Sequence, residues 1–306
     1  MDTDGQDPLR LHNPVAVAAG GTVFDLIWPD PLAAPILFNS PHSGDAYPED
    51  FLALTRLGLR DLRRSADLFM DDLAGGAISA GLPLMHVHLP RSVVDMNRDA
   101  DDLDPEMFDA PLAVPVNRRS LRVSNGYGVI PRLVADSVAI YGTRIAPAVA
   151  SDRLARCHAP YHTALDRALA ALAAPLGWSL IVDCHSMPSA APTTGSALAD
   201  IVLGDRNATS CDPAIIDCAE TLFTGLGFSV ARNQPYAGGF ITSRHGRPWD
   251  GRHALQIEVN RALYMDEATY RPHRGYHDVR RALARLAGSL VALAPSIERP
   301  VRRAAE

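Results

Sequence analysis

Two segments that lie far apart in the sequence each bring a histidine to the end of a short apolar run. Residues 36–38 lead into a polar turn that contains His42, and residues 179–182 lead into Asp-Cys-His-Ser, which contains His185. Both runs are typical of buried strands, and ligands of open α/β sheets bind beyond the carboxyl ends of the strands. A catalytic zinc ion needs three protein ligands and one open position, and two imidazoles with one carboxylate are a common set. Either histidine alone could be satisfied by a loop carbonyl, but the repeated pattern favours a metal site.

Asp67 is one candidate for the carboxylate of this site. It lies near the start of an expected helix over residues 65–80 and shares a helix face with Asp71, four residues on. Acidic residues in a first turn also occur because they complement the helix dipole. This explanation is preferred for Asp72, and for Asp67 the two interpretations carry about equal weight.

Two further histidine pairs are interpreted as structural. His86 and His88 alternate on an expected strand over residues 82–89, and a pair on the sheet surface is favoured because no acidic ligand follows them. His158 and His162 lie four residues apart in a helical region, but the glutamate that a helical zinc motif places beside its first histidine is missing. A core or capping role is therefore expected for this second pair.

Composition restricts the class of protein. The chain has 306 residues with 47% hydrophobic residues, enough for a full core, and its net charge of −6 argues against nucleic acid as a partner. It contains no lysine, which excludes a lysine nucleophile or Schiff base. The four cysteines form no Cys-x-x-Cys pair, so a zinc knuckle and disulfides are not expected. Without an export signal or an apolar run of roughly 20 residues, we expect a cytoplasmic protein and no membrane partner.

Strand and helix patterns alternate along the chain. They predict one α/β domain over residues 1–306, folded as a three-layer α/β/α sandwich, with a loose arm at residues 1–20. Residues 99–125 have no regular pattern and are a candidate lid, because loops this long are usually functional or mobile. The expected strands are 200–205, 228–231 and 253–259, and the expected helices are 48–57, 145–176, 213–226 and 275–294. The strand over residues 82–89 is expected to extend through residues 93–94, and residues 234–246 are expected to form a glycine-rich loop.

Six motifs in order resemble the N-formylglutamate amidohydrolase family, over roughly residues 36–266. Each motif is weak alone, but six in the same order are specific. They are Pro41-His-Ser-Gly, Val94-Asp-Met-Asn-Arg98, Tyr127-Gly-Val-Ile-Pro-Arg, Asp183-Cys-His-Ser, Gly238-Gly-Phe-Ile-Thr and Gln256-Ile-Glu-Val-Asn-Arg261. The resemblance implies the mixed-sheet fold of the zinc carboxypeptidase and aspartoacylase group, one Zn²⁺ ion, and amide hydrolysis.

The same resemblance implies roles for single residues. His42 and His185 are expected to bind the metal, with Asp67 as the third ligand and Asp45 as the alternative. Glu258 is similar to the general base of the wider group. Asn97 and Arg98 correspond to a segment that holds a substrate carboxylate in aspartoacylases.

Arginines at strand ends or glycine turns are expected to bind a substrate with two carboxylates, because a guanidinium forms paired hydrogen bonds. The candidates are Arg98, Arg132, Arg244 and Arg261, of which at least one should instead form a structural ion pair. Arg244 or Arg91 is expected to stabilise the oxyanion.

The expected partner is a small N-acyl amino acid. The first hypothesis is hydrolysis of N-formyl-L-glutamate to formate and L-glutamate, as in histidine degradation. The alternatives are hydrolysis of another N-acyl amino acid or small peptide, and a binding protein without catalysis on the same fold.

Overall fold

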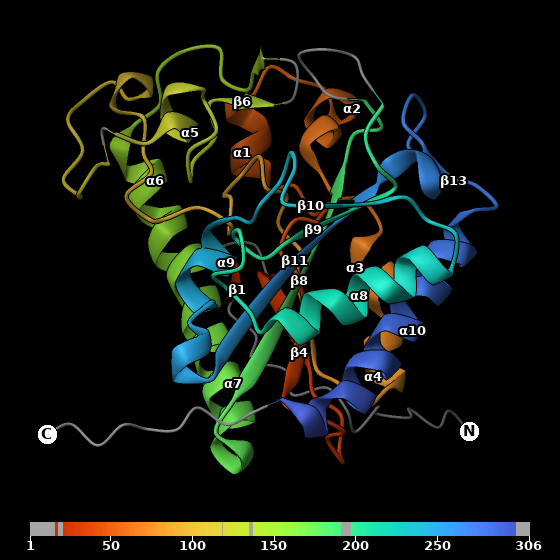
Figure 1. Ribbon diagram of the computed structural model, residues 1–306. Coiled ribbons are helices and arrows are strands. Elements are labelled where there is room, and N and C mark those ends of the chain that lie inside the picture. Colours follow the sequence, from red (N-terminus) through yellow and green to blue (C-terminus); the bar gives the residue numbers. More distant parts are fainter. Residues whose placement is uncertain (1–15, 18–20, 118, 135–136, 191–196, 298–306) are drawn as a thin grey trace, which may run out of the picture.

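The computed structural model describes residues 16–17, 21–117, 119–134, 137–190 and 197–297. The predicted arm at residues 1–20 therefore lies almost wholly outside the described residues. A seven-stranded sheet, β10-β9-β11-β8-β4-β5-β3, forms the centre (Figure 1). Strands β11, β8, β4 and β5 are mutually parallel, whereas β3 and β9 run antiparallel to their neighbours β5 and β11. The strands are β3 (Phe24–Ile27), β4 (Ile36–Ser40), β5 (Leu84–Val87), β8 (Ser179–Met187), β9 (Ile201–Gly204), β10 (Val230–Arg232) and β11 (Arg252–Asn260).

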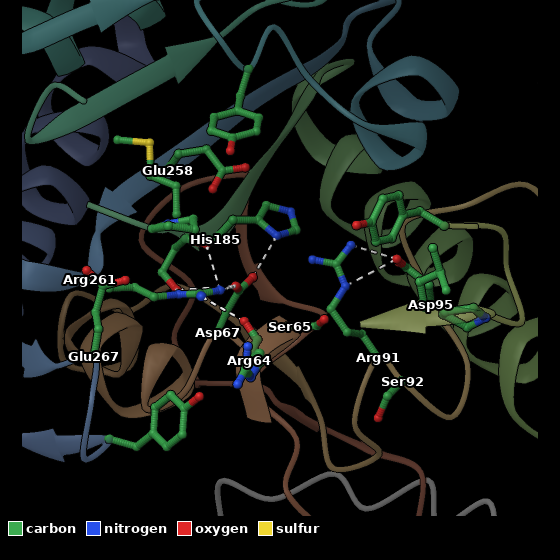
Figure 2. Close-up of a pocket in the computed structure, with 18 of the residues that line it drawn as sticks. Arg64, Ser65, Asp67, Arg91, Ser92, Asp95, His185, Glu258, Arg261 and Glu267 are labelled. Carbon is green, nitrogen blue, oxygen red and sulfur yellow. Dashed lines mark hydrogen bonds and ion pairs between the residues drawn. The ribbon is translucent and has the colours of Figure 1, made fainter. Parts of the chain in front are cut away.

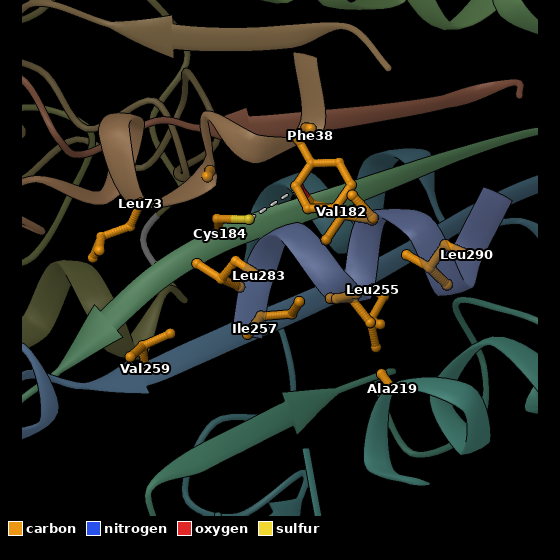
Figure 3. Close-up of a cluster of buried hydrophobic side chains, with 14 of the residues drawn as sticks. Phe38, Leu73, Val182, Cys184, Ala219, Leu255, Ile257, Val259, Leu283 and Leu290 are labelled. Carbon is orange, nitrogen blue, oxygen red and sulfur yellow. Dashed lines mark hydrogen bonds between the residues drawn. The ribbon is translucent and has the colours of Figure 1, made fainter. Parts of the chain in front are cut away.

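Helices cover both faces of this sheet. One face packs against α3 (Met70–Ala74), α4 (Gly76–Ser79), α8 (Pro213–Gly225) and α10 (Tyr276–Leu293). Their apolar stripes meet every second residue of the strands, among them Phe38, Val182 and Leu255 (Figure 3). The other face packs against α6 (Pro147–Arg153), α7 (Ala159–Leu176) and α9 (Phe240–His245). The three-layer α/β/α fold with a mixed sheet is thus confirmed.

Shorter elements connect these layers. Most of the predicted lid, residues 99–125, is irregular, and whether it moves stays a prediction. No helix among the described residues is long and apolar enough to cross a lipid bilayer. The shorter elements are the helices α1 (Glu49–Leu54), α2 (Leu59–Leu62) and α5 (Leu121–Ser124), the π-helix Leu154–His158, and the strands β1 (Ala16–Val17), β2 (Gly21–Thr22), β6 (Leu133–Val134), β7 (Val138–Ala139), β12 (Met265–Asp266) and β13 (Arg271–Pro272). Single 3₁₀ turns are Arg63–Ser65, Pro105–Met107, Pro248–Asp250, Arg261–Leu263 and Ala294–Ser296.

The structure corrects four local predictions. The strand expected to end at residue 182 continues to Met187, because β11 pairs with it over its whole length. The single helix expected over residues 65–80 is wrong, since Asp67 donates its backbone N–H to His42 and Phe69 has a φ of 68°. The strand expected to continue through residues 93–94 is a turn. The loop expected over residues 234–246 contains α9.

Candidate metal centre and catalytic cavity

Three side chains converge where the central parallel strands end. His42 follows β4, His185 lies on β8, and Asp67 lies in the extended segment before α3. The two Nδ1 atoms are 3.1 Å apart, and Asp67 Oδ2 lies 3.4 Å from Nδ1 of His42 and 3.1 Å from Nδ1 of His185. Ligands of a tetrahedral zinc ion, bound at about 2.0–2.1 Å, lie roughly 3.3 Å from one another. The three predicted metal ligands are therefore together, at separations that suit one ion.

When both imidazoles are neutral, the hydrogen bonds around this cluster leave three acceptors facing one another. Nε2 of His42 donates to Asp95 Oδ1 at 2.7 Å, and Nε2 of His185 donates to Asp183 Oδ2 at 2.9 Å. Neutral imidazoles bonded in this way present a lone pair at Nδ1. Two lone pairs and the carboxylate of Asp67, all buried and this close, repel each other unless a cation lies between them. This donor set fits a divalent metal ion.

Each imidazole is held by a further layer of hydrogen bonds. Behind His185, Asp183 accepts from Nδ2 of Asn39 at 2.8 Å, and Asn39 Oδ1 accepts from the hydroxyl of Tyr161 at 2.8 Å. This chain of hydrogen bonds links the candidate metal centre through β8 and β4 to α7. Outer hydrogen bonds of this kind fix the ring orientation of metal-bound histidines and raise their basicity.

The side of Asp67 that faces away from the cluster is also fixed. Oδ1 accepts from Nη2 of Arg261 and from the hydroxyl of Ser186, both at 3.2 Å. Burial alone would raise the pKa of Asp67, but the side chains of His185 and His42 beside it hold this pKa well below the usual value. Asp67 is thus a carboxylate, as a metal ligand must be. Arg261, predicted as a substrate ligand, makes its contacts to Asp67, Ser186 and the Arg64 carbonyl.

Glu258 lies on β11 in direct register with His185 on the parallel strand β8. Residues in register point to the same side of a sheet, so both side chains reach the same cavity (Figure 2). Nε2 of Gln256 donates to Oε1 of Glu258 at 2.9 Å. Burial raises the pKa of Glu258 to about 7, even though His185 lowers it. A carboxylate with this pKa can both accept and return a proton near neutral pH.

The cavity has a volume of about 900 Å³, and its described lining contains five arginines: Arg60, Arg64, Arg91, Arg98 and Arg261. Arg91 donates from Nε and Nη2 to Asp95, and its guanidinium points between Asp95 and His185 (Figure 2). Its Nη1 makes no hydrogen bond to any described residue. Arg98 is anchored by the carbonyls of Tyr127 and Asn97. These cations favour an anionic ligand.

Four predicted residues are placed elsewhere than expected. Asp45 is exposed and pairs with Arg63, so Asp67 rather than Asp45 joins the cluster. Asn97 lies behind His185, where its Nδ2 is 3.2 Å from Nε2 of His185 and its Oδ1 accepts from the N–H of Ile241.

Two arginines form ion pairs outside the cavity lining, Arg132 with Asp104 and Arg244 with Asp166. Both are more than two-fifths exposed, which makes surface ion pairs the simplest description of them.

Sequence reasoning did not assign roles to the two outer carboxylates. Asp183 stands two residues before His185, and alternation along a strand places such residues on the same face, so this signal was available. Asp95 is far from His42 in the sequence, and only the folded chain joins them.

The loop of Asp95 is held in place by two histidines, because His158 and His162 contact the carbonyls of Arg98 and Met96 at 2.9 and 3.0 Å. Both histidines are buried, and the structural role predicted for them is confirmed.

Comparisons with known proteins find relatives by sequence and by structure. Residues 34–265 match the model of the N-formylglutamate amidohydrolase family. N-formylglutamate deformylase of Pseudomonas aeruginosa is 31% identical over 241 residues, 76% of this chain and 83% of the relative, and that of Pseudomonas putida is 29% identical, covering 78% and 85%. The crystal structure of N-formylglutamate amidohydrolase from Ralstonia eutropha JMP134 is 33% identical, with a TM-score of 0.84 over 90% of this chain and 99% of that one. A gene product of Agrobacterium tumefaciens, 18% identical over 90% of this chain and 95% of that one, shares the fold with a TM-score of 0.63.

Proposed function

The chain belongs to the N-formylglutamate amidohydrolase family, and we propose that it hydrolyses the amide bond of N-formyl-L-glutamate to formate and L-glutamate. The observation that carries this proposal is the convergence of His42, Asp67 and His185 beside the buried carboxylate of Glu258. Relatives named for this reaction, over most of their length, support the choice of substrate.

His42, Asp67 and His185 are the residues that hold the metal, with zinc as the ion that suits their ligand set. When bound, the ion supplies the Lewis acidity that polarises the formyl carbonyl and makes water a better nucleophile at neutral pH. Asp95 and Asp183 keep both imidazoles in the tautomer whose Nδ1 faces the ion.

Glu258 is the general base and then the general acid. Its carboxylate takes a proton from the attacking water as the new bond to the formyl carbon forms. It then gives this proton to the nitrogen of glutamate as the C–N bond breaks. The buried position of Glu258 serves both steps, because the raised pKa makes return of the proton as accessible as its removal.

Arginines hold the two carboxylates of the substrate and the developing oxyanion. Arg91 is the arginine assigned to the oxyanion, since its guanidinium points toward the cluster and its Nη1 makes no hydrogen bond to a described residue. Arg98 remains a substrate-binding candidate, with Arg60 and Arg64 on the same cavity lining. Arg132 and Arg244 are not included, because neither belongs to the described cavity lining.

A substrate panel tests this proposal. We expect formate release from N-formyl-L-glutamate by the zinc-loaded protein, and much lower turnover of N-acetyl-L-glutamate and of N-formyl-L-leucine, which lacks the second carboxylate. Arg91→Gln should lose turnover, whereas Arg244→Gln is the matched control that should not. Turnover of N-acetyl-L-glutamate with none of N-formyl-L-glutamate would replace the substrate. No turnover of any compound with bound zinc would contradict the enzymatic proposal.

A further inference from the structure

A second group of metal-ligating side chains lies at the edge of the sheet formed by β3 and β5. It consists of Asp25 on β3, His86 on β5 and His88 just after β5. Asp25 Oδ2 lies 3.2 Å from Nε2 of His88 and 3.8 Å from Nε2 of His86. One ligand atom from each of the three residues lies within 4.8 Å of the others.

Strand pairing brings these side chains together. Asp25 is the antiparallel partner of His86, and the backbone N–H of His88 donates to the carbonyl of Val23, which extends the same ladder. Alternation places His86 and His88 on the face of Leu84, which packs in the core beside α3 and α10. The cluster thus lies on the α3 face of the sheet, whereas Asp183 meets α7 on the other face.

We propose that Asp25, His86 and His88 bind a second divalent transition-metal ion, with zinc as the best match to two imidazoles and a carboxylate. Ligand atoms at about 2.0–2.2 Å from a common ion lie roughly 3 to 4 Å apart, and both measured separations fall in this range. The acid that the sequence around the two histidines does not supply comes from the neighbouring strand. The side chains are 16%, 15% and 30% exposed, which lets an ion enter and water complete its coordination.

Two neighbouring polar side chains are compatible with a metal ion at this site. Asp71 on α3 lies 3.9 Å from Nδ1 of His86, the nitrogen that faces away from Asp25. Ser40 on β4 is in register with His86 on the same face, and its fully buried hydroxyl has no hydrogen-bond partner among the described residues. An ion here joins the edge strand β3 to β5, so its role is to stabilise the sheet rather than to take part in hydrolysis.

Metal stoichiometry tests the site directly. The full chain, stripped with a chelator, is dialysed to equilibrium against Zn²⁺, and bound zinc is measured by mass spectrometry. We expect the wild-type protein to bind one equivalent more than His88→Ala, and zinc to raise its Tm by more. His88 is partly exposed and outside the catalytic cavity, so the turnover of the His88→Ala variant at saturating zinc should equal that of the wild type.

His277→Ala is the matched control, because His277 is an exposed histidine on α10 that is not part of either cluster. It should keep the wild-type stoichiometry and the wild-type zinc-dependent Tm. Equal zinc binding by wild type, His88→Ala and Asp25→Asn would overturn the second site. The result is independent of the proposed function, because the difference of one equivalent is expected whether or not the catalytic cluster binds metal.

Discussion

The two histidine and aspartate clusters have the same ligand types but differ in what surrounds them. In the cluster proposed to be catalytic, called the catalytic cluster below, the side chains of His42, Asp67 and His185 are at most 4% exposed. In the edge cluster, formed by Asp25, His86 and His88, the exposed fraction of a side chain reaches 30% at His88. Each catalytic imidazole also donates its outer nitrogen to a carboxylate within 2.9 Å, whereas Asp71 stands 3.9 Å from His86. The same residue types can therefore form a rigid site that excludes water or a looser site that solvent reaches.

This difference predicts a ranking of affinities. A site whose ligands are already oriented binds its ion without ordering side chains, and a water-excluded site strengthens the electrostatic attraction. Zinc should therefore fill the catalytic cluster first and the edge cluster at higher concentration. Substitutions that remove an outer hydrogen bond from the catalytic cluster should lower its zinc affinity toward that of the edge cluster.

The largest effect is expected from His185→Ala, which removes a ligand. The catalytic cluster then has two ligands, so the metal bound at this cluster and the turnover should disappear together. One equivalent of zinc should remain at the edge cluster. Zinc content by mass spectrometry and formate release measure both outcomes on the same sample. Turnover near the wild-type rate in protein that lacks zinc at this cluster would contradict the metal assignment.

Glu258→Gln should leave metal bound at both clusters but lower turnover by at least about 10²-fold, because it removes the proposed general base. The loss should appear in kcat with the zinc content unchanged. Glu267→Gln, on the same cavity lining, is the matched control and should retain most of the activity. If Glu258→Gln remains near the wild-type rate, the proton is taken by another group.

The same substitution also predicts a pH-dependent stability in the metal-free protein. Burial raises the pKa of Glu258 from 4.5 to about 7, so its contribution to stability is complete below pH 4.5 and is lost as pH rises through 7. Glu258→Gln cannot ionise and avoids this loss. The Tm of the metal-free variant should therefore exceed that of the metal-free wild type at pH 8 and approach it at pH 4.5. A Tm difference that does not change with pH would show that Glu258 keeps an ordinary pKa.

Asp183→Asn should weaken zinc binding at the catalytic cluster by roughly 10- to 100-fold, which is typical for outer partners of metal-bound histidines. The neutral amide no longer fixes the His185 tautomer, so this cluster becomes more like the edge cluster. Competition with a chelator of known affinity measures the change, and circular dichroism checks the fold. Unchanged zinc affinity would show that burial alone sets the difference between the clusters.

The smallest effect is expected from Tyr161→Phe, which removes the outermost hydrogen bond of the same chain. Asn39 Oδ1 loses its hydroxyl donor, which should destabilise the fold by about 1–3 kcal/mol as a buried acceptor is left unpaired. Zinc affinity should fall less than in Asp183→Asn. A loss of zinc binding equal to that of Asp183→Asn would mean that the chain acts as one unit rather than in layers.

The sequence was sufficient for the parts of the site that follow from strand ends and local motifs. His42, His185 and Glu258 each lie on or just after a predicted strand, and the resemblance to the family predicts their roles. It was less informative where long-range contacts decide the local conformation. Asp67 was expected on a helix, but its hydrogen bond to the His42 carbonyl draws the segment into an extended path that no local pattern encodes.

The arginines are a second case in which residues distant in sequence decide the role of a side chain. Arg132 and Arg244 looked suitable because they follow glycine turns, but the choice between a substrate and an ion pair depends on Asp104 and Asp166, which are distant in sequence. For the same reason no spacing rule could have joined Asp25 to His86 and His88. Only the antiparallel position of β3 beside β5 makes this contact.

The direct register of Glu258 with His185 determines how this fold can change its specificity. Their separation is set by backbone hydrogen bonds between β11 and β8, so it is established once the sheet has formed and does not depend on a closing segment. The largely irregular region at residues 99–117 and 119–134 contributes Tyr127, Pro131 and Leu133 to the cavity lining. Variation confined to that region can therefore change the cavity lining while Glu258 and His185 keep their geometry, so under the proposed function this region is the target for redesigning substrate range.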